Sequence, residues 1–167
     1  MLLEGKVAVI YGAGGSIGGT VARAFAHEGA RLFLAGRTLD KLDITAHDIR
    51  ANGGTADTAV VDALDEQAVG AYVDRVVEQA GGLDISFNLI SYADVQSALL
   101  DLSVEDFLQP IATAMRTQFV TTRAAARHMV KRGGGVILHF GGGGPQTMPG
   151  LGGFKIALDA VEEIGRA

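Results

Sequence analysis

The chain has 167 residues, 48% of them hydrophobic, which is enough for one folded domain over residues 1–167 with a sizeable core. Its formal net charge of −5 argues against a nucleic-acid partner, because no basic face dominates. Cysteine is absent, which excludes disulfides and thiol catalysis. No apolar run reaches the length of a membrane span, so we expect a cytoplasmic protein with no membrane partner.

Short apolar runs alternate with helical patterns along the chain. In chain order they predict a strand at Val7–Tyr11, a helix from about Ile17 to Gly29, a strand at Arg31–Ala35, a helix at Asp40–Asn52, a strand at Thr58–Val61, a helix at Asp65–Ala80 and a strand at Leu83–Ile90. Beyond these, Ser103 caps a short helix, Pro110 begins a long helix to Arg132, a strand spans Val136–Phe140, and a last helix begins around Leu151 to Lys155. This alternation predicts an α/β fold, a doubly wound parallel sheet of about five strands in the order 3-2-1-4-5 between two helical layers.

A glycine-rich turn joins the first strand to the first helix. Small residues there let the backbone approach a pyrophosphate, and the N-terminus of a helix offers it free N–H groups. The strand before the turn and the helix after it supply the context of a dinucleotide fingerprint. We therefore expect Gly12, Gly15, Ser16, Ile17 and Gly18 to bind a nicotinamide dinucleotide. The alternative is a glycine turn that binds nothing.

The end of the second strand indicates which dinucleotide is bound. Dinucleotide folds place there either an acid for a ribose hydroxyl or a base for a 2′-phosphate. Arg37 and Thr38 occupy this place, and a guanidinium matches the geometry of a phosphate. The sequence favours NADP over NAD. The alternative is a solvated surface arginine.

Several dispersed motifs together resemble the short-chain dehydrogenase/reductase family along essentially the whole chain. The segment from Tyr11 to Gly18 occupies the family's Thr-Gly-x-x-x-Gly-x-Gly motif, with Tyr in place of Thr and Ser16 in place of the middle Gly. The resemblance implies a Rossmann fold and hydride transfer between a nicotinamide and a carbonyl or secondary alcohol. It also implies that Asp62 and Ala63 line the adenine pocket and that Asn88 supports the end of the fourth strand. A turn or capping role for Asp62 remains open.

The same resemblance fails at most catalytic positions. The family uses a tyrosine as proton donor and, four residues later, a lysine that lowers the tyrosine pKa and holds the ribose. Lys155 matches the lysine, but Leu151 stands at the tyrosine position. The family's serine falls on Gly142 and its asparagine near Ala114. A related pattern that places tyrosine seven residues before lysine has Met148 there.

A different side chain would have to supply the proton. His139, Tyr92 and Ser91 are the candidates by their order among the motifs. His139 has a neutral-range reference pKa, and a structural role is its alternative. Tyr92 follows the fourth strand, where a loop-packing role is the alternative. No pattern of metal ligands is evident, so we expect no metal site.

Two functions fit these residues. The first is an NADP-dependent oxidoreductase of short-chain dehydrogenase/reductase type that acts on an unidentified carbonyl or alcohol, with Lys155 retained and His139 as a candidate for catalysis. The second is a non-catalytic, degenerate family member that binds NADP or oligomerises. An apolar stripe on the last helix suggests a homo-oligomer; its residues are Leu151, Phe154, Leu158 and Val161. The alternative is that this stripe covers the sheet. The chain is also C-terminally short relative to the family, so we expect it to lack part of the substrate pocket, and a fragment without independent activity is a third reading.

Overall fold

The computed structural model describes residues 1–141 and 149–165. Helices and strands alternate throughout this part of the chain. They are β1 (Val7–Tyr11), α1 (Ser16–His27), β2 (Arg31–Gly36), α2 (Leu39–Ala51), β3 (Thr55–Val60), α3 (Glu66–Ala80), β4 (Ile85–Asn88), α4 (Val104–Lys131), β5 (Val136–His139) and α5 (Gly152–Ile164). Each predicted strand is present, and the bounds differ by up to three residues.

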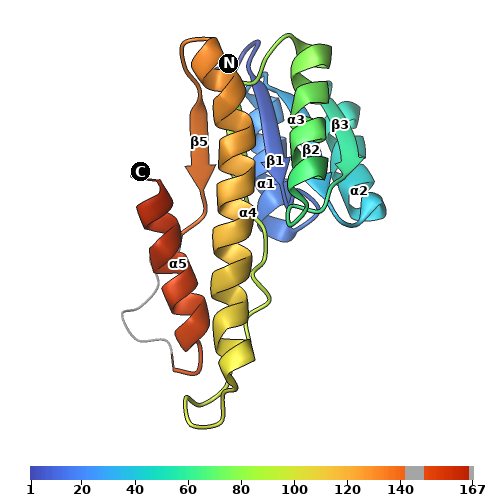
Figure 1. Ribbon diagram of the computed structural model, residues 1–167. Helices are drawn as coiled ribbons and strands as arrows, with labels where there is room; N and C mark the ends of the chain where they lie inside the picture. The colour runs from blue at the N-terminus through green and yellow to red at the C-terminus, as the bar shows by residue number, and fades with distance from the viewer. Residues whose placement is uncertain (142–148, 166–167) are drawn as a thin grey trace.

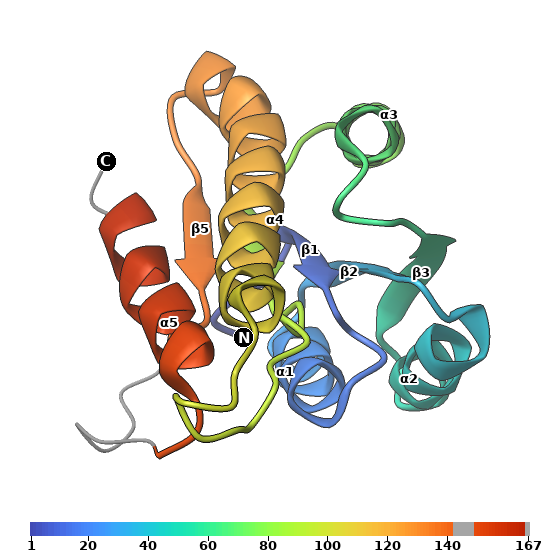
Figure 2. The ribbon, with the colours of Figure 1, turned by 60° about the horizontal axis from the view of Figure 1, so that its bottom comes forward.

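The five strands form one parallel sheet in the order β3-β2-β1-β4-β5, as the sequence predicts. Helices α1 and α2 cover one face, and α3 and α4 cover the other (Figure 2). Strand β1 is buried along its whole length, as expected of a central strand whose two faces are both covered. Consecutive strands lie side by side on one half of the sheet, and the chain then crosses β1 to start the other half.

Two apolar clusters hold the layers together. One cluster joins the sheet to α1 and α2, and includes Leu32, Leu34 and Leu42. The other joins the opposite face to α3 and α4, and includes Val73 and Val120. Each buried Leu or Val side chain contributes about 1.5–3 kcal/mol relative to full exposure. Both faces of the sheet are therefore closely packed, and this packing fixes the positions of the residues at the carboxyl ends of the strands.

The long helix α4 differs from the expected pair of helices. Ser103 caps it, accepting a hydrogen bond from the Asp106 backbone N–H at 3.0 Å, but the helix continues through Pro110 instead of restarting there. A proline inside a helix loses one hydrogen bond and crowds the preceding turn. Pro110 is buried against α5, since a Cβ on Gly153 would lie 3.1 Å from its ring. This packing and the Ser103 cap offset the cost, and α4 stays continuous.

Helix α5 lies along α4, beyond the edge strand β5 (Figure 1). The two helices share a third apolar cluster, which also takes in the ring of Tyr92 from the loop after β4. Leu158 and Val161 of the stripe predicted on the last helix are buried in this cluster against α4, so they are not available to a second copy of the chain. Gly153 allows the close approach, because a Cβ there would lie 2.3 Å from the Phe107 carbonyl oxygen. Tyr92 is thus held between a strand end and two helices.

Candidate dinucleotide site

Two cavities open along the carboxyl ends of the strands, where the strand order reverses between β1 and β4. In open α/β sheets, ligands bind at this switch point. The first cavity has a volume of about 320 Å³ and extends from the glycine turn toward the ends of β2 and β3. The second has a volume of about 560 Å³ and extends from the same turn toward α5. The glycine turn lies between the two cavities, and Gly12 and Gly15 line both of them.

Packing requires glycine at two positions of this turn. Gly12 has φ +76°, and a Cβ there would lie 2.2 Å from the Leu89 carbonyl oxygen. A Cβ on Gly18 would lie 2.3 Å from the Gly12 carbonyl oxygen. Gly15 is less restricted, with its nearest contact at 3.3 Å. Because glycine has no Cβ, Gly12 and Gly18 allow α1 to begin directly against the end of β1.

The first turn of α1 presents unoccupied donors to the second cavity, next to the glycine turn that both cavities share. Gly15 is the N-cap residue and makes no side-chain capping bond, and the first turn carries no acidic residue. The backbone N–H groups of Ser16, Ile17 and Gly18 are at positions that have no acceptor within a helix. By contrast, α3 is capped by the Asp65 carboxylate, which accepts from Gln67 and Ala68. The start of α1 therefore suits an external anion such as a pyrophosphate.

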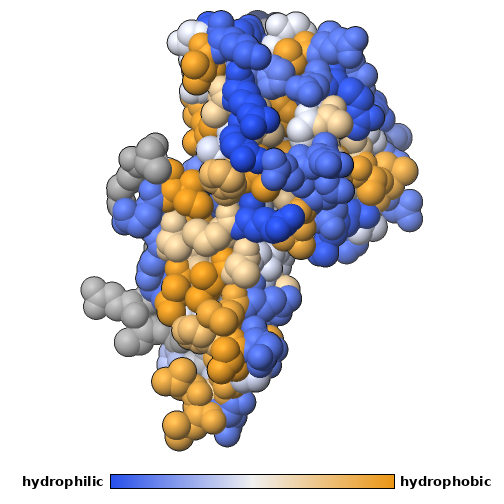
Figure 3. Space-filling view, in the orientation of Figure 1, coloured by the Kyte–Doolittle hydropathy of each residue, from blue (hydrophilic) through white to orange (hydrophobic). Residues whose placement is uncertain are grey.

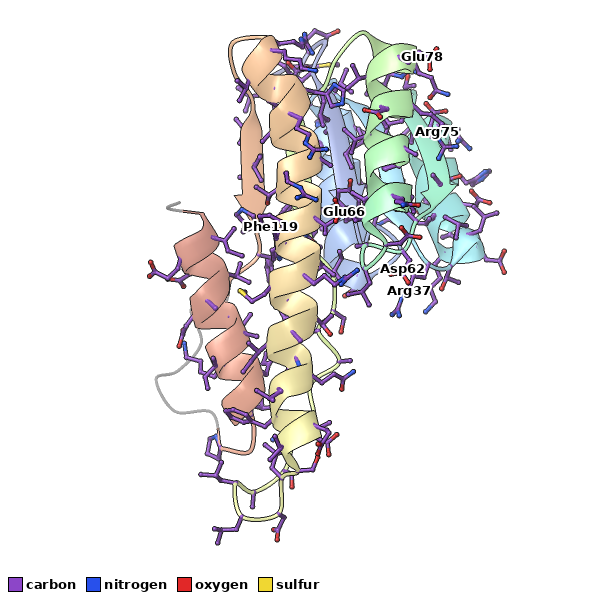
Figure 4. All side chains as sticks on the ribbon, viewed as in Figure 1. Arg37, Asp62, Glu66, Arg75, Glu78 and Phe119 are labelled. Atoms are coloured by element: carbon purple, nitrogen blue, oxygen red, sulfur yellow. The ribbon has the colours of Figure 1, made fainter. Side chains whose placement is uncertain are left out.

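Cationic side chains border the first cavity at the end of β2. Arg37 and Thr38 line it, as does Lys41, one turn into α2. Among the described residues, neither Arg37 nor Lys41 makes an ion pair. Figure 4 shows Arg37 close to Asp62 where β2 and β3 end. This corner of the cavity has two cations available for a phosphate.

The third and fourth strands complete the first cavity. Asp62 and Ala63 line it, and the Asp62 carboxylate accepts a hydrogen bond from the Leu64 backbone N–H at 3.0 Å. Asn88 lines neither cavity. Its side-chain amide donates to Thr121 Oγ1 at 2.8 Å and so ties β4 to α4 below the site. The expected supporting role of Asn88 is consistent with this position.

The second cavity is bordered mainly by apolar side chains. Phe140, Phe154 and Leu158 line it, together with Tyr92 and Asp94. Lys155 does not line either cavity, and its ammonium group pairs with Asp159 one turn further along α5. The structure therefore does not bring Lys155 together with the glycine turn, and its assignment to the cofactor stays a prediction.

The remaining catalytic positions carry no proton donor where the structure describes them. Leu151 is the N-cap residue of α5, and Ala114 is fully buried in α4. Gly142 and Met148 lie outside the described residues. At the family's tyrosine, serine and asparagine positions, this chain has no side chain of similar chemistry.

A hydrogen-bonded row of three side chains lies beside the second cavity. Gln118, which has 0% of its surface exposed, donates from Nε2 to the Tyr92 hydroxyl oxygen at 2.7 Å. Its Oε1 lies 2.7 Å from Nδ1 of His139. Burial lowers the pKa of His139 below its ordinary value of 6.5. His139 itself lines neither cavity.

Sequence reasoning missed Lys41 and Gln118. Lys41 follows Arg37 by four residues, and this spacing across the start of a helix was an available signal. Gln118 gave no signal, because a polar residue in an amphipathic helix is usually expected to face water. It is buried because β5 and α5 cover this part of α4.

Comparisons with known proteins agree with this fold. The family model for short chain dehydrogenases matches residues 6–144, so the chain belongs to the short-chain dehydrogenase/reductase family. The match includes the glycine turn, Arg37 and Asn88 but ends before α5. The family is one of oxidoreductases that bind a nicotinamide dinucleotide.

Curated relatives show the same affiliation. The chain is 34% identical over 135 residues to an uncharacterized oxidoreductase, YxbG, of Bacillus subtilis, with 81% of this chain and 50% of the relative covered. It is 35% identical over 139 residues to gluconate 5-dehydrogenase of Gluconobacter oxydans, with 82% and 53% covered. The chain thus spans about half the length of the curated relatives it matches.

A solved structure of NAD⁺-bound xylitol dehydrogenase superposes with a TM-score of 0.92 at 27% identity, covering 98% of this chain and 64% of that one. A metagenomic short-chain oxidoreductase in complex with NADP shares the fold, with a TM-score of 0.89 at 24% identity, covering 98% and 75%. Both nicotinamide dinucleotides thus occur among proteins of this fold.

Within the described ranges, no helix has the length and apolar character needed to cross a membrane. The same residues contain no group of three or more His, Asp or Glu side chains that could hold a metal ion.

Proposed function

We propose that the chain is an NADP-dependent oxidoreductase that reduces a carbonyl or oxidises a secondary alcohol. The single observation that carries this proposal is the arrangement around the glycine turn. The glycine turn and the cations Arg37 and Lys41 border the first cavity, and the uncapped start of α1 borders the second cavity, next to the turn that both cavities share. A dinucleotide with a 2′-phosphate carries its anionic groups at both places.

The choice of NADP rests on charge. A 2′-phosphate beside Arg37 and Lys41 gains charge-assisted hydrogen bonds, whereas the ribose hydroxyl of NAD lacks the usual acidic partner there. Asp40, in the first turn of α2, does not line the cavity. Bound NADPH supplies the hydride. The chain's residues then have to hold the nucleotide, exclude water from the second cavity and provide a proton.

A second candidate is a binding module without redox activity. Leu151 at the tyrosine position and the pairing of Lys155 with Asp159 favour it. It shares the cofactor site with the first candidate and differs only in the second cavity. Turnover, rather than binding, separates the two.

The test of the proposal is an equilibrium titration of NADPH and NADH against the purified chain and its Arg37→Ala variant. We expect saturable binding of both nucleotides, tighter for NADPH, and a selective loss of NADPH affinity in the variant. NADPH oxidation with a panel of ketones and aldehydes then distinguishes the enzyme from the binding module. Equal affinity for the two nucleotides in both proteins would refute the NADP assignment.

We also propose that α4 and α5 pair with a second copy of the chain. Apolar side chains gather on the outer face over the lower parts of these helices (Figure 3). Exposed large apolar residues on the two helices include Val104, Leu108, Phe119 and Ile156. Sedimentation of the wild type and a Phe119→Asp variant tests this, with the variant shifted toward monomer; a wild type that sediments as a monomer contradicts it. A cytoplasmic location remains a prediction from the sequence.

A further inference from the structure

The second cavity has a candidate proton donor at a position where the family motifs do not place one. Only two side chains with ionisable groups line it among the described residues, Tyr92 and Asp94. Asp94 is exposed to solvent, whereas Tyr92 has 4% of its surface exposed. Tyr92 comes from the loop after β4, and its ring packs between α4 and α5 next to Phe154, with ring centroids 6.3 Å apart.

The hydroxyl of Tyr92 is held in place by the row of hydrogen-bonded side chains that includes Gln118 and His139. The oxygen accepts from Gln118, and Gln118 in turn contacts Nδ1 of His139, with both distances at 2.7 Å. Burying a side-chain amide costs free energy unless its N–H and C=O groups form hydrogen bonds. Partners at both ends of the Gln118 amide therefore fix its orientation. With Nδ1–H of His139 donating to Oε1, the N–H side of the Gln118 amide faces the tyrosine.

The hydrogen of the same hydroxyl has no acceptor among the described residues. The oxygen is already engaged by Gln118, so the O–H can be donated to a ligand without breaking the row. An oxygen that loses this proton keeps the Gln118 N–H as a stabilising donor. These are the requirements for a general acid placed in a cavity.

We propose that Tyr92 is the proton donor for carbonyl reduction in the second cavity, with Gln118 and His139 as positioning residues; this rests on the proposed NADP-dependent function. As the carbonyl carbon accepts hydride from NADPH, the carbonyl oxygen takes the Tyr92 hydroxyl proton. The products are NADP⁺, the alcohol and a Tyr92 phenolate. Water then returns a proton to the phenolate, which closes the cycle.

The environment of Tyr92 favours reduction over oxidation. Burial raises the pKa of Tyr92 above its ordinary value of 10.0, and the hydrogen bond from Gln118 opposes this in part. The hydroxyl is therefore protonated at neutral pH and ready to donate. Oxidation of an alcohol would need the phenolate as a base, and at neutral pH that form is scarce.

Tyr72 offers a matched control. It is also 4% exposed, but it belongs to α3, and it lines neither of the two cavities. Its hydroxyl has no hydrogen-bond partner among the described residues. Tyr72→Phe therefore removes a buried hydroxyl without touching the proposed reaction.

The test compares the wild type with Tyr92→Phe, Gln118→Met and Tyr72→Phe. For each protein we would measure the melting temperature, the NADPH dissociation constant and the steady-state reduction of a panel of ketones and aldehydes. We expect Tyr92→Phe to lower kcat about 100-fold with NADPH affinity unchanged. Gln118→Met should lower kcat at least fivefold with KM unchanged, because it removes the N–H donor to the phenolate. Tyr72→Phe should stay within twofold of the wild type.

Each outcome decides a different point. A failure of NADPH to bind refutes the proposed function, and this inference with it. Binding without reduction of any carbonyl by the wild type overturns the role of Tyr92 but leaves the cofactor site. A loss of tenfold or more in Tyr92→Phe supports the role, and a smaller loss overturns it. If Tyr92→Phe does not fold, the kcat of Gln118→Met decides by its fivefold threshold.

Discussion

The first and second cavities share the glycine turn but differ in how closely they follow the family pattern. The first keeps the turn and the residues at the ends of β2 and β3. Near the second, Leu151 stands where the family has tyrosine, and Lys155 outside the cavity is directed to Asp159. Tyr92 lines this cavity from the loop after β4, and Gln118 on the buried face of α4 binds its hydroxyl. On our proposals, nucleotide binding and proton transfer depend on separate groups of residues, which separate variants can disrupt.

The largest effect is expected from Gly18→Ala, which disrupts the glycine turn shared by the two cavities. Its Cβ would lie 2.3 Å from the Gly12 carbonyl oxygen, so the start of α1 must move away from the turn. We expect NADPH affinity to fall at least about 100-fold, since both the amides and the dipole are displaced. Fluorescence titration of NADPH measures this.

Gly70→Ala is the matched control for that variant. Gly70 lies in α3, and a Cβ there meets nothing within 4 Å. We expect unchanged NADPH affinity and a gain of up to about 1 kcal/mol in the free energy of unfolding. Equal losses of affinity in the two variants would contradict the role given to the turn.

A smaller effect on binding is expected from Arg37→Ala. Losing one charge-assisted contact should weaken NADPH binding by about 1–3 kcal/mol and leave NADH unchanged. Arg75→Ala is the control, because Arg75 lies on α3 outside both cavities (Figure 4). Calorimetric titration of both nucleotides provides the measurement. An equal loss of affinity for NADH would show that Arg37 does not contact the 2′-phosphate.

Gln118→Leu tests the stability of the second region. It leaves the buried Tyr92 hydroxyl and Nδ1 of His139 without their partner. We expect the free energy of unfolding to fall by about 1–3 kcal/mol, with NADPH affinity unchanged. Urea unfolding measures the first quantity and fluorescence titration the second. A parallel loss of NADPH affinity would show that the two regions are not separable.

The smallest effect is a pH dependence from His139. Burial lowers its pKa in the folded state below 6.5, so the unfolded state binds the proton first as the pH falls. The stability from the neutral imidazole is present above pH 6.5 and is lost as the pH falls below it. The effect should stay under about 1 kcal/mol because the ring is only partly buried. Urea unfolding at pH 7.5 and pH 5.5 should show a smaller pH dependence in His139→Gln than in the wild type, and identical slopes would refute it.

The contrast between the cavities also explains what the sequence could reveal. Strand order, the glycine turn and Arg37 depend on local patterns of glycines, apolar runs and charges, and the fold agrees with them. Pro110 misled the prediction, because its packing against Gly153 lies more than 40 residues away in the sequence. The row from Tyr92 through Gln118 to His139 joins three elements that are distant in sequence. No spacing rule could have assembled it, although Tyr92 and His139 were each candidates alone.

The central claim is that the first crossover binds a phosphorylated dinucleotide independently of the row from Tyr92 through Gln118 to His139. Calorimetric titration with 2′-phospho-ADP-ribose and with ADP-ribose tests this most directly, because these ligands lack the nicotinamide and carry only the groups that the glycine turn and Arg37 are proposed to bind. We predict saturable binding of both, about tenfold or more tighter for the 2′-phosphorylated ligand. No saturable binding of either ligand, or equal affinity for the two, would contradict the claim.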